Sequence, residues 1–347
     1  MKLAIVQLSD MHCDESADSY TMKIDKAINA INSLGHIDKV VLVFSGDLTN
    51  SSLYKEFNAA KKLIGRFLEG LSAKLSCGFI HTMIVPGNHD IFLTEKSRTA
   101  KDIESWKDKS THLNDELRLM RGFFNYSKSK KCFENSCLYD VRCIDVENLK
   151  IQFVLLNSAP FSTLKPDDKQ FHYLPPYVEE KIIRDTDVDL KITVMHHHFE
   201  WCEWNTKELL LRSISSDDVT LFGHDHKAES RTTRSSKGNT YNVVMGGCFD
   251  LNINNSAAFN IITYDSETRS IERVEFNWNI HNRMFIPTKK SPLKKRNHQL
   301  TPNDEYLMKI SADNQNLSRN LDEYYVFPKL FAEGEYFESN KNIGEIN

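Results

Sequence analysis

Residues 79–90 read FIHTMIVPGNHD, a stretch in which an apolar run gives way to a proline, a glycine and the polar side chains of Asn88, His89 and Asp90. A short run rich in aliphatic residues is typical of a buried strand, and the Pro-Gly pair indicates that the strand ends in a turn. Asparagine, histidine and aspartate are side chains that bind divalent metals. The stretch therefore predicts a strand that delivers candidate metal ligands to its carboxyl end.

Four further blocks of the same kind each follow an apolar run. They are Asp10-Met11-His12 after residues 3–8, Gly46-Asp47 after 40–44, His196-His197-His198 after 190–195, and Gly223-His224-Asp225-His226 after 219–222. Each block taken alone is as consistent with an ordinary turn or helix cap as with a binding site. All five in this order, each at the end of a predicted strand, indicate side chains that converge on one rim.

The spacing of apolar residues around these blocks predicts the fold class. In the first part of the chain, strand-like runs alternate with helical spacing, and the segments in order are 3–8, 24–34, 40–44, 53–71 and 79–85. Ser51 or Ser52 would cap the second of these helices. Seven more strand-like runs follow, at 138–144, 151–157, 190–195, 219–222, 241–245, 259–264 and 271–278. We expect an α/β (α+β) fold, a sandwich of two mixed β-sheets flanked by helices.

Two segments depart from this alternation. Residues 92–137 are charged and carry a helical pattern with few strand signals, which predicts a helical insertion. Residues 281–347 begin with a basic stretch at 289–296, interpreted as a linker, and continue into the apolar run 324–331. We expect a main domain over 1–280, followed by a C-terminal extension that docks on it, leads to a further module or binds a protein partner.

Composition narrows the classes of protein. The chain has 347 residues, a formal net charge of −4 and 40% hydrophobic residues, which excludes disorder throughout and argues against a nucleic-acid binder that relies on a polybasic surface. No window approaches the ~18 to 20 consecutive apolar residues that cross a bilayer, and the N-terminus lacks a signal-peptide core. The seven cysteines are an odd number scattered through a long chain, unlike the dense even set of a secreted scaffold. We therefore expect a cytoplasmic protein without a membrane partner.

Together, the five blocks resemble the signature of the calcineurin-like metallophosphoesterase superfamily, written D-x-H, G-D, G-N-H-[D/E], H and G-H-x-H. The resemblance covers approximately residues 1–280. It implies a four-layer αββα sandwich with a centre of two divalent metal ions at the strand ends. Mn, Fe, Zn, Co and Ni all suit mixed nitrogen and oxygen ligands. The resemblance also implies hydrolysis of a phosphate ester.

Carried over residue by residue, the resemblance implies two ligand sets and a bridge. One ion would be held by Asp10, His12 and His226, the second by Asn88, His196 and His224, and both by Asp47. A carboxylate that bridges two cations about 3.5–4 Å apart leaves room for a water that becomes a nucleophile near neutral pH. At the fourth block His197 is the reserve candidate for the metal ligand, and we otherwise assign it to substrate binding.

The resemblance gives His89 a different role, since this histidine of the family approaches the substrate and stabilises or protonates the leaving oxygen. Some branches orient it with an aspartate three residues after the bridge, where this chain has Asn50. We expect Asp90 to serve as the catalytic partner instead, or His89 to act mainly as a hydrogen-bond donor. Arg231, followed by Arg234, is a candidate for binding a second phosphate.

Three functions remain open, of which the first two are enzymatic and the third belongs to another class. The first is a metal-dependent phosphoesterase acting on a phosphomonoester or phosphodiester, with a nucleotide among the candidate substrates. Trp201 and Trp204 would then stack on a base or pack at the rim, and the sequence favours neither. The second is a DNA or RNA nuclease similar to the repair-exonuclease branch, supported by basic residues 289–296 and the pair Arg231/Arg234 and opposed by the net charge. The third is an interaction module of a bacterial multidomain defence protein.

Overall fold

The computed structural model describes residues 1–295 except for 16–20, 76–79, 96, 129–130, 135, 147–148, 166, 183–186 and 235–239. The chain divides into one unit of residues Met1–Asn297 and a second unit, His298–Asn347. The apolar run 324–331 of the predicted C-terminal extension lies outside the described residues, so its docking or partner role stays a prediction.

The first sheet has six strands in the order β12-β11-β10-β1-β2-β3. Its strands are β1 (Lys2–Leu8), β2 (Lys39–Ser45), β3 (Ile80–Val85), β10 (Ala258–Asp265), β11 (Ser270–Asn279) and β12 (Met284–Leu293). Strands β1, β2 and β3 are parallel, whereas β10, β11 and β12 join antiparallel. The parallel strands are connected by helices, which are α1 (Thr21–Asn32) and α2 (Tyr54–Lys74). β1 is buried from Leu3 to Leu8, which explains its nearly unbroken apolar run.

The second sheet also has six strands, in the order β4-β5-β6-β7-β9-β8. They are β4 (Tyr139–Val146), β5 (Leu149–Leu156), β6 (Leu190–Met195), β7 (Val219–Phe222), β8 (Glu229–Arg234) and β9 (Thr240–Met245). The four central strands are parallel, and the edge strands β4 and β8 are antiparallel to their neighbours. The helices that follow β5 and β6 are α6 (Tyr177–Lys181) and α7 (Trp204–Ile214).

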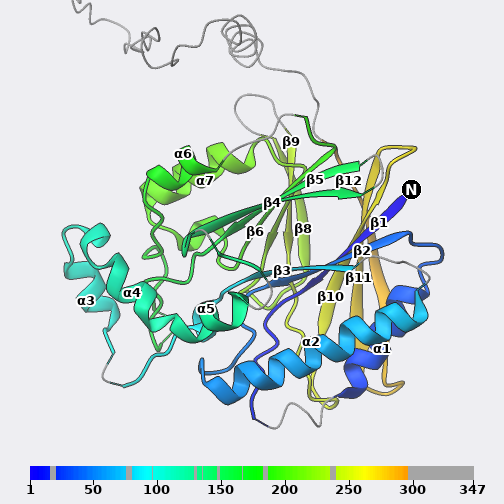
Figure 1. Ribbon diagram of the computed structural model, residues 1–347, viewed down its shortest axis with the longest axis horizontal. Helices are drawn as coiled ribbons and strands as arrows, with labels where there is room; N and C mark the ends of the chain where they lie inside the picture. Colours follow the sequence, from blue (N-terminus) through cyan, green and yellow to red (C-terminus); the bar gives the residue numbers. More distant parts are fainter. Residues whose placement is uncertain are drawn as a thin grey trace, which may run out of the picture. The chain divides into compact units, whose positions relative to one another are not determined.

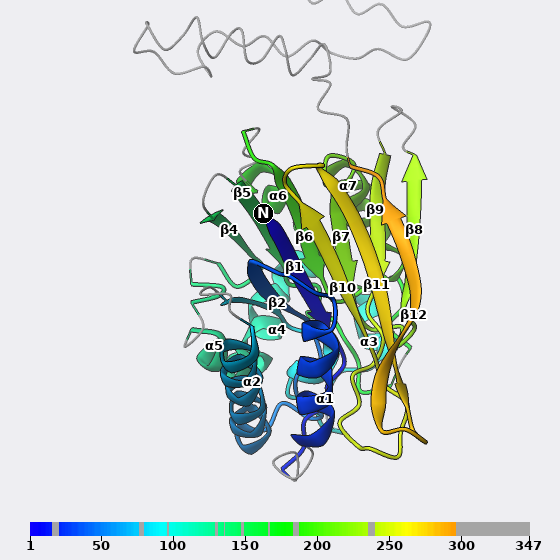
Figure 2. The same cartoon turned by 90° about the vertical axis from the view of Figure 1, so that its right-hand side faces the viewer.

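The two sheets pack face to face, and helices cover their outer faces (Figures 1 and 2). Ile28 of α1 and Phe67 of α2 belong to a buried cluster that contains inner-face residues of both sheets. Leu209 of α7 packs in a second cluster with Leu156 of the second sheet. The order of layers is therefore helix, sheet, sheet, helix. The predicted αββα sandwich of two mixed sheets is confirmed.

Between β3 and β4, the described residues form helices and loops. The helices are η2 (Asn88–Asp90), α3 (Ala100–Ser105), η3 (Lys109–Thr111), α4 (Leu113–Leu119) and α5 (Arg121–Lys128), of which η2 and η3 are 3-10 turns. Figure 1 shows α3 and α4 at one end of the sandwich. Phe123 of α5 joins the main buried cluster, and Ile103 of α3 joins the second. The segment predicted as a helical insertion is therefore packed on the sandwich.

Strand β12 corrects the predicted domain boundary at residue 280. It pairs with β11 along its whole length, and its Phe285 side chain is buried. Lys290 forms an ion pair with Glu272 of β11 at 2.9 Å. The first part of the predicted basic linker is thus an edge strand, where lysine and proline are common because they discourage further strand pairing.

The start of α2 also differs from the prediction. Its N-cap is Leu53, whose side chain cannot accept a hydrogen bond, and not Ser51 or Ser52. The carboxylate of Glu56 accepts hydrogen bonds from the backbone N–H groups of Ser51 and Leu53, at 2.9 and 3.0 Å, and so satisfies the helix start. Ser52 Oγ instead donates to the carbonyl of Asp90 at 2.9 Å. This serine therefore ties α2 to the loop after β3.

Candidate metal centre

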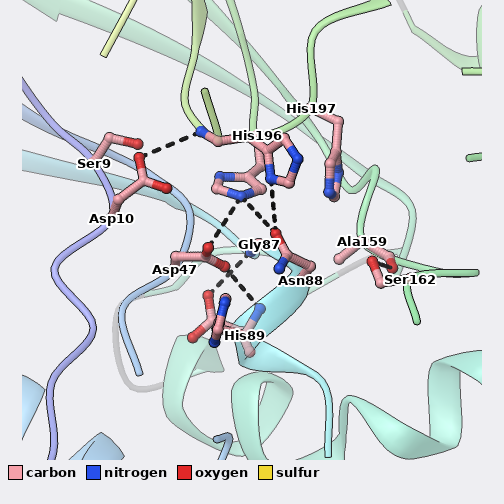
Figure 3. A network of polar contacts seen from close by, with 12 residues as sticks. Ser9, Asp10, Asp47, Gly87, Asn88, His89, Ala159, Ser162, His196 and His197 are labelled. Atoms are coloured by element: carbon pink, nitrogen blue, oxygen red, sulfur yellow. Dashed lines mark hydrogen bonds and ion pairs between the residues drawn. The ribbon is translucent and has the colours of Figure 1, made fainter. Parts of the chain in front are cut away.

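Polar residues from the ends of several strands face one another (Figure 3), and His224 joins them with its Nδ1 2.9 Å from Asn88 Oδ1. They follow β1, β2 and β3 of the first sheet and β6 and β7 of the second. Asp47 Oδ2, after β2, lies 3.3 Å from His196 Nε2, after β6. The cluster therefore spans both sheets, and its geometry depends on how the two sheets pack.

Five of the seven predicted ligands have a left-handed backbone. The φ angles are 54° at Asp10, 45° at His12, 53° at Asp47, 69° at His224 and 55° at His226. A non-glycine residue in this region costs about 1–3 kcal/mol, and such residues persist only where the surroundings hold them there. The left-handed residues are the ones whose carboxylate and imidazole groups converge on one point, as expected of a functional site.

Two glycines make room for these side chains. Gly46 has φ 101°, and a Cβ atom there would overlap the imidazole of His196. A Cβ atom on Gly87 would overlap the carboxylate of Asp47. Glycine is therefore required at both positions by close approach of a ligand side chain, and at Gly46 also by the backbone conformation.

One group of donor atoms is built from the loops after β1 and β7. His226 Nε2 lies 3.2 Å from Asp10 Oδ1 and 3.4 Å from His12 Nε2. Asp10 Oδ2 accepts a hydrogen bond from the backbone N–H of His224 at 3.3 Å. The structure thus brings together the three residues that the resemblance assigns to the first metal ion.

A second group surrounds Asn88. Asn88 Oδ1 lies 3.1 Å from His196 Nε2 and 2.9 Å from His224 Nδ1. His196 Nδ1 is 2.8 Å from the carbonyl oxygen of Ser45, so Nδ1–H donates there, and Nε2 faces Asn88 and Asp47. A backbone carbonyl that fixes the histidine tautomer in this way is typical of metal ligands. These residues match the second predicted set, with Asp47 beside both groups.

Electrostatics favour a cation at this position. Burial raises the pKa of Asp47, but neighbouring imidazoles, with His196 the strongest, outweigh burial and hold this pKa well below its usual range. Burial opposes a charge on His196, yet Asp47 outweighs burial and raises the pKa of His196 to about 9. Burial also lowers the pKa of His224 to about 3. Asp47 is therefore ionised, and His224 is a neutral imidazole ready to donate a lone pair.

The donor set fits divalent metal ions. Asp10, Asp47 and His196 offer ligand atoms that all lie within 4.8 Å of one another, and so do His12, Asp47 and His89. Asp47 thus lies close to Asp10 and His12 of the first predicted ligand set and to His196 of the second, as a bridge requires. Mixed imidazole nitrogen and carboxylate or amide oxygen donors suit Mn, Fe, Zn, Co and Ni.

His89 is oriented by the backbone. Its backbone N–H donates to Asp47 Oδ1 at 2.8 Å, and its ring Nδ1 lies 2.7 Å from the carbonyl oxygen of Asn50. The ring also makes an edge contact with His12, with centroids 4.6 Å apart. Nδ1–H therefore donates to the Asn50 carbonyl, which leaves Nε2 for a substrate. Residue 50 therefore orients the His89 ring through its backbone carbonyl oxygen, a group that does not depend on the side chain at this position.

Asp90 is placed differently from the prediction. Its fully buried carboxylate accepts hydrogen bonds from the backbone N–H groups of Leu48, Thr49 and Gly87, at 3.2, 3.1 and 3.0 Å, and from Thr49 Oγ1 at 2.9 Å. Burial, and then the charge of Asp47, raises its pKa to about 6. Asp90 thus ties the loop after β2 to the loop after β3. It positions these loops and does not orient the imidazole of His89.

His197 lies behind the ligands. It is fully buried, its Nδ1 is 2.9 Å from Ser158 Oγ, and its ring stacks on His172 with centroids 3.7 Å apart. Its ring also lies close to His196 and His224, with ligand atoms within 4.8 Å. Sequence reasoning missed Ser158 and His172, because neither stands in a motif, and only the folded chain brings them to this layer.

The remaining candidates lie at the periphery. Arg231 is exposed, and its Nε lies 2.7 Å from Glu229 Oε1, so a phosphate would have to compete with that carboxylate. The Trp201 ring contacts His224 edge-on, with centroids 4.2 Å apart, and its Nε1–H donates to Asp225. Trp204 is 70% exposed. Trp201 is thus part of the wall of the centre, whereas Trp204 is a surface residue.

Residues 3–228 match the family described as calcineurin-like phosphoesterases, and the chain belongs to that family. A curated relative from Vesicomyosocius okutanii, described as a probable cyclic nucleotide phosphodiesterase, is 31% identical over 93 residues. This match covers 26% of the chain, and the chain spans only 34% of that relative's length. Membership of the family indicates a metal-dependent hydrolase of phosphate esters.

Two solved structures are among those to which this chain shows a distant similarity. Vps29 from Entamoeba histolytica, complexed with zinc, is 11% identical and matches 84% of this chain and 99% of its own, with a TM-score of 0.34. GAP50, the anchor in the inner membrane complex of Plasmodium, is also 11% identical and matches 90% of this chain and 94% of its own, with a TM-score of 0.47. In the part of the chain that the structure describes, no helix is both long and apolar enough to cross a membrane.

Proposed function

We propose that this protein hydrolyses a phosphodiester of a nucleotide with the help of two divalent metal ions. The observation that carries the proposal is the convergence of seven candidate ligand side chains from both sheets, five of them on a left-handed backbone. Family membership supports phosphoester hydrolysis. The nucleotide is supported by the partial match to a probable cyclic nucleotide phosphodiesterase.

Each ligand has a defined place in the proposed centre. Asp10, His12 and His226 would hold one ion, Asn88, His196 and His224 the other, and Asp47 both. When bound, the ions supply Lewis acidity to the phosphoryl oxygens and lower the pKa of water. The protein contributes fixed donors in a largely buried setting, so that little reorganisation is needed when charge develops.

His89 acts on the leaving group. With Nδ1–H directed to the Asn50 carbonyl, a protonated His89 has a second N–H, on Nε2, to offer to a substrate. This N–H can donate to the leaving oxygen as the bond to phosphorus breaks, which is general-acid work. The backbone N–H of His89 donates to Asp47 Oδ1, and this hydrogen bond links the position of the proposed acid to that of the proposed bridge.

The alternatives receive no specific support. A nuclease would use Arg231 and the basic stretch at 289–296, but Arg231 is paired with Glu229, and Lys290 of β12 is paired with Glu272. An interaction module would depend on the C-terminal extension, which lies outside the described residues. The cytoplasmic location stays a prediction.

The proposal is tested by a substrate panel with metal-loaded and metal-stripped protein. We expect hydrolysis of nucleotide phosphodiesters by the loaded form, slower hydrolysis of phosphomonoesters, and none of either by the form kept in chelator. Cleavage of single- or double-stranded DNA at a higher rate than any small diester would contradict the proposal in favour of the nuclease. Full activity in chelator would remove the metal mechanism.

A further inference from the structure

A cysteine outside the five polar blocks lies beside the first predicted ligand set. Cys248 follows β9, on the loop that leads to β10. Its Sγ and one ring nitrogen each of His12 and His226 all lie within 4.8 Å of one another. Sulfur and imidazole nitrogen are both ligands of borderline divalent metals such as zinc. Neither the sequence motifs nor the resemblance gives Cys248 a role, yet its sulfur stands among candidate metal ligands.

The backbone around Cys248 is tied to two strands of the first sheet. Cys248 forms an isolated bridge with Ser9, the residue after β1, and the N–H of Phe249 donates to the carbonyl of Ser9 at 2.8 Å. The carbonyl of Cys248 accepts a hydrogen bond from the N–H of Ala258, at the start of β10, at 2.9 Å. The side chain of Phe249 is fully buried. The cysteine is therefore held beside the loop after β1 that carries two of the predicted ligands.

The side chain of Cys248 is directed at this loop. It is partly buried, and its Sγ lies 3.2 Å from the carbonyl oxygen of Asp10, to which the thiol donates. A thiol is a weak hydrogen-bond donor, so little is lost when the S–H···O contact is given up. The contact holds the sulfur next to a predicted ligand without committing it to a strong partner.

The other donor atoms of this cluster have the separations expected around one metal ion. Two nitrogens bound to zinc at about 2.0–2.1 Å lie about 3.4 Å apart at tetrahedral angles. His12 Nε2 and His226 Nε2 are 3.4 Å apart, and His226 Nε2 is 3.2 Å from Asp10 Oδ1. Asp10 is fully buried, and its Oδ1 accepts no well-aligned hydrogen bond from the described residues. A buried carboxylate oxygen of this kind, beside two imidazole nitrogens and a sulfur, points to a cation as the partner.

We propose that Cys248 is a sulfur ligand of the first metal ion, beside Asp10, His12 and His226. This inference rests on the proposed function and adds a donor to its centre. On binding, the thiol loses its proton to solvent, and the sulfur exchanges its contact with the Asp10 carbonyl for a bond to the metal. Thiolate is a soft ligand, so the first site would favour zinc, cobalt or iron over manganese. The second set has only nitrogen and oxygen donors, and the two sites would therefore differ in metal preference.

The absorption spectrum of cobalt-loaded protein tests the sulfur ligand without catalysis. We expect metal-free wild type titrated with Co²⁺ to gain sulfur-to-cobalt charge-transfer absorption in the near ultraviolet, and Cys248→Ser and Cys248→Ala to lack it. The serine variant can keep the hydrogen bond to the Asp10 carbonyl, and circular dichroism checks the fold of both variants. Cys143→Ser is the matched control and should keep the absorption, because Cys143 is exposed on the edge strand β4 of the second sheet. Wild type without this absorption at saturating Co²⁺, or a Cys248→Ser variant that keeps it, would overturn the proposal.

Competition between two metals tests the consequence for metal choice. Removing a group that supports a metal ligand costs about 10- to 100-fold in metal affinity, and removing a ligand should cost at least as much. We expect Cys248→Ser to lose about tenfold or more of the wild-type preference for zinc over manganese, measured as bound metal after dialysis against both. The Cys143→Ser control should keep the preference. An unchanged preference in Cys248→Ser would overturn the role of the sulfur in metal choice.

Diester hydrolysis measured on the same samples separates this inference from the proposed function. Metal-dependent hydrolysis by a wild type that shows no charge-transfer absorption would remove Cys248 from the ligand set and leave the proposed function standing. Absorption that depends on Cys248, in a protein that hydrolyses no phosphodiester, would instead refute the proposed function alone.

Discussion

The hydrogen bond between His89 Nδ1 and the backbone carbonyl of Asn50 leads to an unequal pair of mutational effects. His89→Gln removes the proton donor and should lower kcat about 10²- to 10⁴-fold. Asn50→Ala keeps the carbonyl, so its kcat should stay within about twofold of wild type, because only an exposed side chain is lost. Steady-state kinetics with metal content measured on the same samples check both values. An Asn50→Ala loss as large as that of His89→Gln would show that the side chain matters.

The candidate ligands that the structure brings together could be picked out from the sequence, whereas the groups that orient them could not. Aspartate, asparagine and histidine at strand ends can be recognised as candidate ligands by their residue type and spacing. The carbonyl oxygens of Asn50 and Ser45 carry no such signal, since every residue has one. Asp90 stood in the expected motif, yet the partners of its carboxylate are backbone N–H groups that only the folded loops bring near.

At the scale of elements, the loop after β2 depends on the absence of a side chain at Gly46. Gly46→Ala places a Cβ atom against the His196 imidazole at a left-handed φ of 101° and should destabilise the protein by about 3 kcal/mol. The matched control is Gly65→Ala in α2, where a Cβ atom meets nothing within 4 Å. It should stabilise the protein by about 0.5–1 kcal/mol, because alanine is the better helix former. Denaturant unfolding measures both changes, and a stable Gly46→Ala variant would contradict the geometry.

Buried strands were predictable, and of the four edge strands β3 and β4 were predicted whereas β8 and β12 were missed. The runs at 190–195 and 219–222 match β6 and β7 because both strands are buried along their whole length, so the apolar pattern is complete. β8 has the sequence ESRTTR and lies at a sheet edge, where half-exposed strands lose this pattern. β12 carries lysines and two prolines, which normally argue against a strand but are tolerated at an edge. Both missed strands are edge strands for this physical reason.

At the scale of the whole molecule, buried neutral imidazoles make stability depend on pH. His172 is fully buried, and burial lowers its pKa to about 3 from an unfolded value near 6.5. Below pH 6.5 the unfolded chain therefore binds a proton that the folded chain does not. The contribution of neutral His172 to the free energy of unfolding is complete above pH 6.5. It is lost as the pH falls towards 3, by up to about 1.4 kcal/mol per pH unit.

The measurement is the free energy of unfolding of metal-free protein between pH 7 and pH 5, for wild type and His172→Gln. The variant lacks this imidazole, so its stability should fall less steeply as the solution is acidified. Metal-free protein is used because metal binding is itself pH-dependent. Identical slopes for the two proteins would show that His172 is accessible to protons in the folded state.

The two-ion centre bridged by Asp47 is the claim on which the whole account depends, and metal stoichiometry joined to turnover tests it most directly. Metal-free protein is reloaded with one divalent metal at a time, and bound metal and phosphodiester hydrolysis are measured on the same sample. We predict about two ions per chain for wild type, and for Asp47→Asn fewer than two with turnover reduced by about 10³-fold or more and the fold retained. An Asp47→Asn variant that keeps both ions and full turnover would contradict the account.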